Sequence, residues 1–245
     1  MSEARPPPST PPTSENASEA ATRTRDDLLV ALTFAAGVVD AVSYLGLGQI
    51  FTANMTGNVV FLGLAIGGGR LPTALHSVGA LIGFSLGALI AGRLLGRTRT
   101  AETWPRRVTW VLFGDLGCLA GFGAVWVAVG GAPGSGVLYV LIALSSLGMG
   151  MQNAAGRHLA VPGLTTTVIT TALSGFMVDL PALGISGSTQ RRTGWAIVAI
   201  LSGAVVGAFL MVHAPVLAPL VTLVVLAAVA VYASSVFRGA PAGLA

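Results

Sequence analysis

The sequence predicts an all-α integral membrane protein with six transmembrane helices, two short re-entrant or broken half-helices and a two-fold internal repeat. Composition is the first reason: of 245 residues, 53% are hydrophobic and 9% are charged, against roughly 25% charged in soluble domains. The mean hydropathy is +0.81. The other two reasons are the lengths of the apolar segments and the positions of the arginines.

The N-terminal residues 1–26 are rich in Pro, Ser, Thr and Glu and hold no apolar run. Such a composition cannot bury a core, so we expect a disordered Pro-rich tail. It is not a signal peptide, because the first apolar run begins at Leu28 and no convincing cleavage site is present. The membrane domain is expected over residues 27–238, and residues 239–245 form a short C-terminal tail.

Six apolar segments are long enough to span a bilayer, which takes about 20 residues per helix. They are Leu28–Leu47, Leu71–Gly92, Val108–Val129, Val137–Gly156, Trp195–Ala214 and Val216–Val236. Two further segments are ambiguous. Asn54–Gly68 is apolar but short, and Thr165–Gly184 is long but carries several threonines, a serine and an aspartate.

The arginines favour six crossings. They gather before the first span, over residues 93–107, before the fifth span and after the last span. With six crossings all these clusters face one side, expected to be cytoplasmic, and Arg70 faces the other. With eight crossings the 93–107 connection opposes the rest, so the eight-helix bundle is the alternative. The six-span arrangement makes both ambiguous segments re-entrant, which is tolerated where backbone is buried in protein or faces water.

A weak internal repeat divides the membrane domain into halves at about residues 28–130 and 137–237. Gly37-x-x-Asp40-Ala41 matches Gly150-x-x-Asn153-Ala154, and Gly83-x-x-x-Gly87 matches Gly203-x-x-x-Gly207. Three spans and one half-helix per half make the halves inverted, which is a recurring plan of transporters. The glycine pairs are expected to pack helices within the chain.

Asp40 is the first candidate site residue, about 12 residues into the first span and so near mid-membrane. An ionised carboxylate there needs a cation, a hydrated cavity or a proton. It either belongs to a transport site or ties helices together by hydrogen bonds. Its repeat mate Asn153 and the adjacent Gln152 are neutral, so a shared site would hold one titratable group and several amides.

The stretch 51–58 is a polar interruption between apolar segments. Asn54, Thr56 and Asn58 could cap a half-helix, bond across helices or bind a solute at a helix N-terminus, and capping is the preferred role. No catalytic residue, metal ligand or cofactor is expected. The predicted substrate-binding residues are Asp40, Asn54, Thr56, Asn58, Gln152, Asn153 and Thr170.

Other polar residues carry structural interpretations. Asp115 lies eight residues from Arg107, so we expect it to pair with that snorkelling side chain. No nucleophile–base signature or phosphate loop appears, and an enzyme is not expected. No aromatic-basic pattern indicates a nucleic-acid partner.

The elements Gly37-x-x-Asp40-Ala41, Phe51, Asn54-Met55-Thr56-Gly57-Asn58 and Gly150-x-Gln152-Asn153-Ala154 resemble the YoaK family, a bacterial membrane family catalogued as a domain of unknown function. The resemblance covers about Leu28 to Val236. In the second half Thr170-Thr171-Ala172 stands where a Thr-Gly would be expected, which weakens the equivalence of the two half-helices. The resemblance implies an inner-membrane protein of about six spans and implies no substrate.

Three functions remain open from the sequence. The first is a small-solute or ion transporter of the bacterial inner membrane, with its site between the halves and its N-terminus in the cytoplasm. The second is a non-transporting scaffold or a lipid- or partner-binding protein, in which the polar residues bond helices together. A channel is the third. The expected partners are the lipid bilayer and an unknown small solute or ion, with a homo-oligomer also open.

Overall fold

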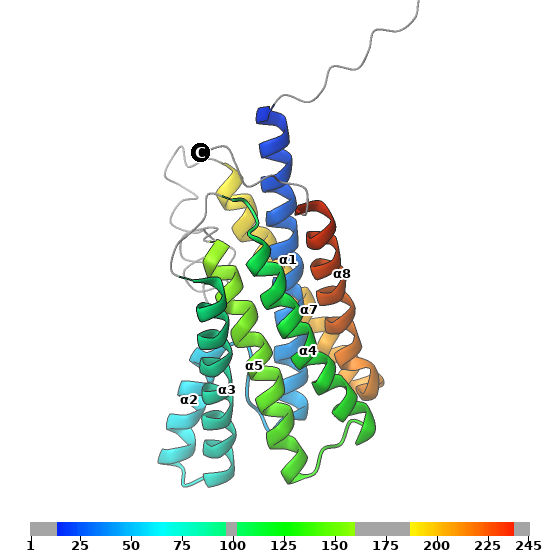
Figure 1. Ribbon diagram of the computed structural model, residues 1–245. Coiled ribbons are helices and arrows are strands. Elements are labelled where there is room, and N and C mark those ends of the chain that lie inside the picture. The colour runs from blue at the N-terminus through cyan, green and yellow to red at the C-terminus, as the bar shows by residue number, and fades with distance from the viewer. Residues whose placement is uncertain (1–13, 97–101, 160–186, 238–245) are drawn as a thin grey trace, which may run out of the picture.

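The computed structural model describes residues 14–96, 102–159 and 187–237, which form helices joined by short connections (Figure 1). Six of these helices are long and apolar enough to cross a membrane, so the predicted all-α membrane fold is confirmed. The helices are α1 (Ser14–Gly46), α2 (Met55–Gly67), α3 (Leu71–Leu95), α4 (Arg106–Ala128), α5 (Ser135–Leu159), α7 (Gly187–His213) and α8 (Ala218–Val236), with a 3-10 turn, η2, at Pro215–Leu217.

The N-terminal part of α1 differs from the sequence expectation. The helix begins at Ser14, so residues 14–26 are helical and the predicted disordered tail is too long. These residues contain several Ala and Glu and no Gly or Pro, which favours a helix. An ion pair between Glu19 and Arg23, at 3.2 Å and four residues apart, supports the same turn.

The short helix α2 does not cross the bundle. Its 13 residues rise about 20 Å at 1.5 Å per residue, and a bilayer core is about 30 Å thick. In Figure 1, α2 starts about halfway along α3 and ends where α3 begins. The chain therefore enters and leaves on one face, as predicted for Asn54–Gly68. The second predicted half-helix, Thr165–Gly184, lies outside the described residues.

In each of the two matched halves, the first helix packs against a helix of the other half. Helix α1 lies against α7, and α5 lies against α3 (Figure 1). In the first contact, Gly203 of α7 faces the backbone of Phe34 in α1. In the second, Gly150 of α5 faces the backbone of Phe84 in α3, and Gly150 is the residue that the repeat matches with Gly37. Because α1 and α5 run in opposite directions, this is the arrangement that an inverted repeat produces. The glycine pairs pack helices within the chain, as predicted.

Burial of the spans follows the same two-fold relation. In the described part of the chain, 61% of the apolar window of α1 and 50% of that of α5 are buried, against 28% for α3 and 22% for α7. Helices α4 and α8 are equal, at 39% each, and they contact one another as well as α5 and α1 respectively. The interior of the bundle is therefore built on α1 and α5, and α3 and α7 present apolar side chains outward.

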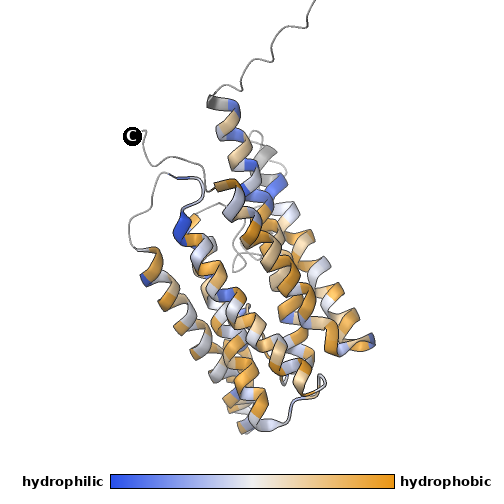
Figure 2. Cartoon of the chain, turned by 45° about the vertical axis from the view of Figure 1, so that its right-hand side comes forward, coloured by the Kyte–Doolittle hydropathy of each residue, from blue (hydrophilic) through white to orange (hydrophobic). Residues whose placement is uncertain are grey.

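Charge is concentrated at one end of the bundle. Helices α1, α4 and α7 begin at this end, and α3, α5 and α8 finish there (Figure 1). Among the described residues, every arginine except Arg70 lies near one of these helix ends. Figure 2 shows hydrophilic residues at the same end and apolar colour over the rest of the spans. The six-span arrangement thus groups the arginines on one side.

Candidate functional site

The candidate site is built on the reversal that follows α1. Gly48 and Gln49 have φ angles of 82° and 62°, in the left-handed region that favours glycine. Gly48 also lies against the ring of His76 in α3, where a Cβ atom would come within 2.6 Å of Nδ1. The reversal returns the chain to the level of Asp40, which lies six residues before the end of α1, or roughly 9 Å along its axis.

Asp40 holds the returning chain in place. Its Oδ1 accepts the backbone N–H groups of Thr52 at 3.1 Å, Ala53 at 2.8 Å and Asn54 at 3.4 Å. Backbone donors at membrane depth must be satisfied by the protein, and one carboxylate oxygen satisfies three of them here. Within the described part of the chain Oδ2 accepts no hydrogen bond, and the side chain is partly exposed.

Asn58 fixes the same loop from the first turn of α2. Its Oδ1 accepts the N–H of Phe51 at 2.9 Å, and its Nδ2 donates to the Phe51 carbonyl oxygen. The Phe51 ring stacks on Tyr44 and Phe61, with centroid distances of 5.5 and 5.6 Å. Gly57 admits this ring, because a Cβ there would lie 2.6 Å from it. Asn58 is fully buried, so it serves the loop backbone.

Asn54 and Thr56 have a different environment, since both are exposed at the start of α2. Asn54 occupies the N-cap position but its side chain makes no capping hydrogen bond, so the predicted capping role is wrong. The physical reason is that the Asn54 side chain is exposed and turned outward, away from the first-turn N–H groups; the N–H groups that Asp40 accepts are those of residues 52–54, before the helix begins. The first-turn N–H groups of a helix have no intrahelical acceptor. The start of α2 therefore combines backbone donors with two outward polar side chains.

The predicted residues of α5 face other neighbours. Gln152 Nε2 donates to the carbonyl oxygen of Leu32 in α1 at 3.1 Å. Asn153, with Arg157, lines a cleft of about 430 Å³ between α3 and α5. The structure thus brings the four first-half residues together and keeps Gln152 on the α1–α5 contact. The remaining predicted residue, Thr170, lies outside the described residues.

The sequence prediction omitted two hydroxyls that join the loop to α5. Thr52 Oγ1 and Ser145 Oγ are 2.8 Å apart and both side chains are buried. This contact ties the loop held by Asp40 to the second half of the protein. The signal in the sequence was the Ser145-Ser146 pair in the middle of an apolar span.

Asp115 is not paired as the sequence suggested. It is 0% exposed, and both carboxyl oxygens lack a hydrogen-bond partner in the described part of the chain. Arg107 instead donates to the carbonyl oxygen of Leu95 at 3.4 Å, near the charged end of the bundle. Asp115 faces inward onto Gly148 of α5, with Oδ1 2.6 Å from the position of an added Cβ. The two helices meet at a residue without a side chain, which leaves room for the carboxyl group.

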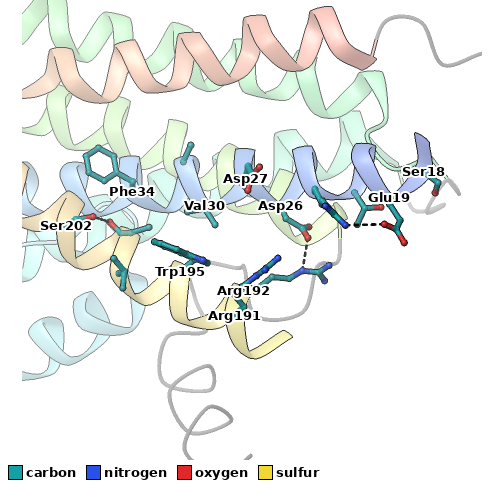
Figure 3. Close-up of a pocket in the computed structure, with 15 residues that line it drawn as sticks. Ser18, Glu19, Asp26, Asp27, Val30, Phe34, Arg191, Arg192, Trp195 and Ser202 are labelled. Atoms are coloured by element: carbon teal, nitrogen blue, oxygen red, sulfur yellow. Dashed lines mark hydrogen bonds and ion pairs between the residues drawn. The ribbon is translucent and has the colours of Figure 1, made fainter. Parts of the chain in front are cut away.

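A second polar cluster lies at the charged end, in a cleft of about 1110 Å³ between α1 and α7 (Figure 3). Asp26 Oδ2 accepts from Nε of Arg192 at 2.7 Å, and Asp26 Oδ1 accepts from Arg25 at 3.1 Å. Figure 3 shows Trp195 and Val30 continuing the cleft toward the apolar middle of the bundle. The Asp26–Arg192 pair therefore connects the first helix of one half to a helix of the other.

Comparisons with known proteins agree with the resemblance in the sequence. Residues 28–232 match a family described as "Protein of unknown function (DUF1275)". The chain is also 39% identical over 156 residues to the UPF0700 transmembrane protein YoaK of Bacillus subtilis (strain 168), an alignment that covers 64% of this chain and 67% of that protein. No solved structure matches the chain.

Proposed function

The chain belongs to the DUF1275 family of YoaK-like transmembrane proteins, and we propose that it transports a small polar solute or ion. Its description as a multi-pass membrane protein rests on the six apolar spans and on the relative. The transport activity is the proposal, and its site is the start of α2 with Asp40 beside it.

One observation carries the proposal: a half-helix begins inside the membrane domain with its polar start exposed. Asn54 and Thr56 face outward, and the Oδ2 atom of Asp40 is not used by the loop. Exposed polar groups at this depth are stable where water or a solute reaches them. The N-terminal end of a helix also favours oxygen acceptors on a ligand. A solute with a carboxylate, carbonyl or hydroxyl oxygen fits these donors.

The inverted arrangement of the halves supports the same function. Transporters with discontinuous helices place the binding site near the bilayer midplane at the interface of their repeats. Here the Thr52–Ser145 contact joins the α2 loop to the other half of the chain. A relative movement of α1 and α5 would change the environment of the loop, because Asp40 and Ser145 hold it from these two helices.

The proposed location is the bacterial inner membrane, with the arginine-rich end in the cytoplasm. The placement of the arginines at one end supports this orientation through the positive-inside rule. The N-terminus would then be cytoplasmic, and the connection between α2 and α3, which contains Arg70, would face the outside.

A second candidate function, a non-transporting scaffold, is favoured by one observation. All the described hydrogen bonds of Asp40 and Asn58 to the loop go to backbone atoms of residues 51–54. In that case the polar residues brace the fold, and the exposed face of α2 contacts lipid or another protein.

Thiol labelling separates the two functions before any substrate is known. In a Cys118→Ala background, which removes the chain's one cysteine, Thr56→Cys is treated with a membrane-impermeant methanethiosulfonate reagent in sealed vesicles. The transporter predicts labelling of this mid-membrane position, because water must reach the site. The matched control is Val60→Cys, one turn further along α2 and 56% exposed, which should react with a lipid-soluble maleimide alone. Labelling of Thr56→Cys by the maleimide alone would place lipid against the site and refute the proposal.

Transport itself is measured in proteoliposomes loaded with a pH-sensitive dye and exposed to a panel of amino acids, organic acids, sugars and inorganic ions. Flux should exceed that of protein-free liposomes for at least one member. Asp40→Asn and Asn58→Ala should reduce that flux or its coupling to protons. If Asp40→Asn, Asp40→Ala and Asn58→Ala all leave flux and coupling unchanged, the site assignment is wrong.

A further inference from the structure

The cleft of about 1110 Å³ between α1 and α7 lies at the charged end of the bundle, away from the start of α2. Pockets that bind small molecules measure roughly 300–1,000 Å³, so this cleft has room for a sizeable ligand. Its polarity changes along its length (Figure 3). Charged side chains line its outer part, and the walls further in are apolar, formed by Val30, Ala31, Phe34, Trp195, Val198 and Ala199.

Both walls change from charged to apolar at the same level. On α1 the change comes after Asp26, and on α7 it comes after Arg192. The ion pair between these two residues, at 2.7 Å, holds the two points side by side. Trp195 follows on α7 and is 58% exposed, as is typical of tryptophan where hydrocarbon meets the headgroups. The cleft therefore runs from the membrane surface into the hydrocarbon.

The apolar part of the cleft has the length of a lipid chain segment. From Asp27 to Phe34 the helix rises about 10 Å, and half of the hydrocarbon core is about 15 Å thick. Val198 on the α7 wall is 54% exposed, so this part is open to the side of the bundle. Ser202 lines the inner part, but its hydroxyl donates to the carbonyl oxygen of Ala199 at 3.0 Å and is therefore satisfied within α7.

The polar part of the cleft holds one unpaired charge of each sign. Its lining contains three acids and three arginines. Arg23 and Arg192 each pair with an acid of α1, at 3.2 and 2.7 Å. Among the described residues, Asp27 and Arg191 make no ion pair, and both are exposed. They belong to opposite walls, since Asp27 is on α1 and Arg191 is on α7 (Figure 3).

A ligand that complements this cleft carries an anionic group, a cationic group next to it and an apolar chain. A phospholipid with an ethanolamine headgroup has all three. Its phosphate suits the guanidinium fork of Arg191, its ammonium suits Asp27, and an acyl chain suits the apolar walls. A lipid with a purely anionic headgroup would leave Asp27 facing a like charge, and a soluble zwitterion would leave the apolar part of the cleft empty.

We propose that the cleft between α1 and α7 is a binding site for one ethanolamine phospholipid, with Arg191 on the phosphate and Asp27 on the amine. The bound lipid covers the contact between α1 and α7, which come from different halves of the repeat. The site is independent of the transport function, because it lies at the membrane surface and takes a component of the bilayer itself.

Native mass spectrometry of the full chain in a mild detergent tests the proposal. The protein is titrated with phosphatidylethanolamine, phosphatidylcholine and phosphatidylglycerol that have identical acyl chains. The ethanolamine lipid should bind about tenfold more tightly than the other two, which is the difference expected for one charge-assisted hydrogen bond. The choline headgroup lacks the N–H donors, and the glycerol headgroup lacks the positive charge. Equal affinity for the three lipids overturns the proposal.

Two variants separate the partners of the headgroup. Arg191→Gln removes the partner of the phosphate and should weaken the binding of all three lipids. Asp27→Asn removes the partner of the amine and should lower the affinity for the ethanolamine lipid alone, to that of the choline lipid. Because neither side chain makes a described ion pair, thermal unfolding of both variants without added lipid should match that of the wild type. An unchanged lipid preference in Asp27→Asn would refute the assignment.

The matched controls are Arg106→Gln and Glu102→Gln, which remove exposed charges at the same end of the bundle but outside the cleft. Both should keep the preference of the wild type, and a loss as large as in the cleft variants would attribute the binding to net charge. Phosphoethanolamine without acyl chains should not displace the lipid at equal concentration; displacement would identify a soluble ligand and overturn the proposal. A chain that binds the lipid but transports no solute would refute the proposed function and leave this inference standing.

Discussion

The close contact between α3 and α5 makes Gly87→Ala the most direct test of the fold. An added Cβ at Gly87 would overlap the carbonyl oxygen of Leu147 and lie 2.8 Å from its carbonyl carbon. These are backbone atoms that no rotamer change can move, so α3 would have to shift away from α5. Overfilling a packed contact costs about 1–3 kcal/mol, whereas the exchange of Gly for Ala in a helix interior itself contributes about 1 kcal/mol of stability.

A matched control removes the helix-propensity contribution. Gly117 lies in the middle of α4 with no atom within 4 Å of an added Cβ. Gly117→Ala should therefore gain the stability that comes from the higher helix propensity of alanine, with no packing cost. The difference between the two variants is then the packing cost alone, about 1–3 kcal/mol. Thermal unfolding in detergent, followed by tryptophan fluorescence, should place Gly87→Ala below Gly117→Ala by about 2–4 °C per kcal/mol.

The inverted repeat adds a second arm to this experiment. The sequence match pairs Gly203 with Gly83, but the contacts pair it with Gly87: an added Cβ at Gly203 would overlap the carbonyl oxygen of Phe34, which precedes Gly37 by three residues as Leu147 precedes Gly150. Gly203→Ala should therefore show a loss of similar size. If Gly87→Ala and Gly203→Ala are both as stable as Gly117→Ala, the two helix crossings are not as close as described, and the partner exchange between halves is wrong.

Three further predictions concern the polar contacts and the topology. Asp40→Ala should destabilise the protein by about 1–3 kcal/mol, because it leaves buried N–H groups without an acceptor. Asp40→Asn keeps an acceptor and should cost less. Equal losses of stability in thermal unfolding would show that the Asp40 side chain does not hold the loop by accepting its N–H groups. Exchange of the Asp26–Arg192 pair should restore stability lost in either single charge reversal, and a double variant no better than the singles would contradict the pairing. A cysteine at Gly69 should be labelled from the side opposite the arginine-rich end, and labelling from that end would show that α2 spans.

Much of the fold follows from local composition. The six spans are recognisable because each must supply about 20 apolar residues to cross the bilayer, and their observed bounds agree with the apolar segments except at the start of α1 and α7. The half-helix was predictable because Asn54–Gly68 is too short to cross and because the arginines group on one side when it does not. The helical start of α1 was missed, since residues 14–26 are polar but still favour a helix.

The candidate site was only partly predictable. Asp40, Asn54, Thr56 and Asn58 were identifiable as polar residues at membrane depth, and they do lie together at the start of α2. The sequence could not predict which of these side chains bonds to the loop backbone and which faces outward, because that depends on how the loop folds back on α1. The capping role expected of Asn54 failed for this reason.

The sequence by itself determined that this chain is a membrane protein, how many long spans it has and where its repeat lies. These properties follow from the transfer free energies of the residues and from their spacing along the chain. The tertiary structure decided the rest. It showed that each half packs its first helix on a helix of the other half, that Asp40 binds three loop N–H groups, and that Asp115 lies against Gly148 instead of pairing with Arg107. These contacts join residues far apart in the chain, and only the packing of helices side by side selects them.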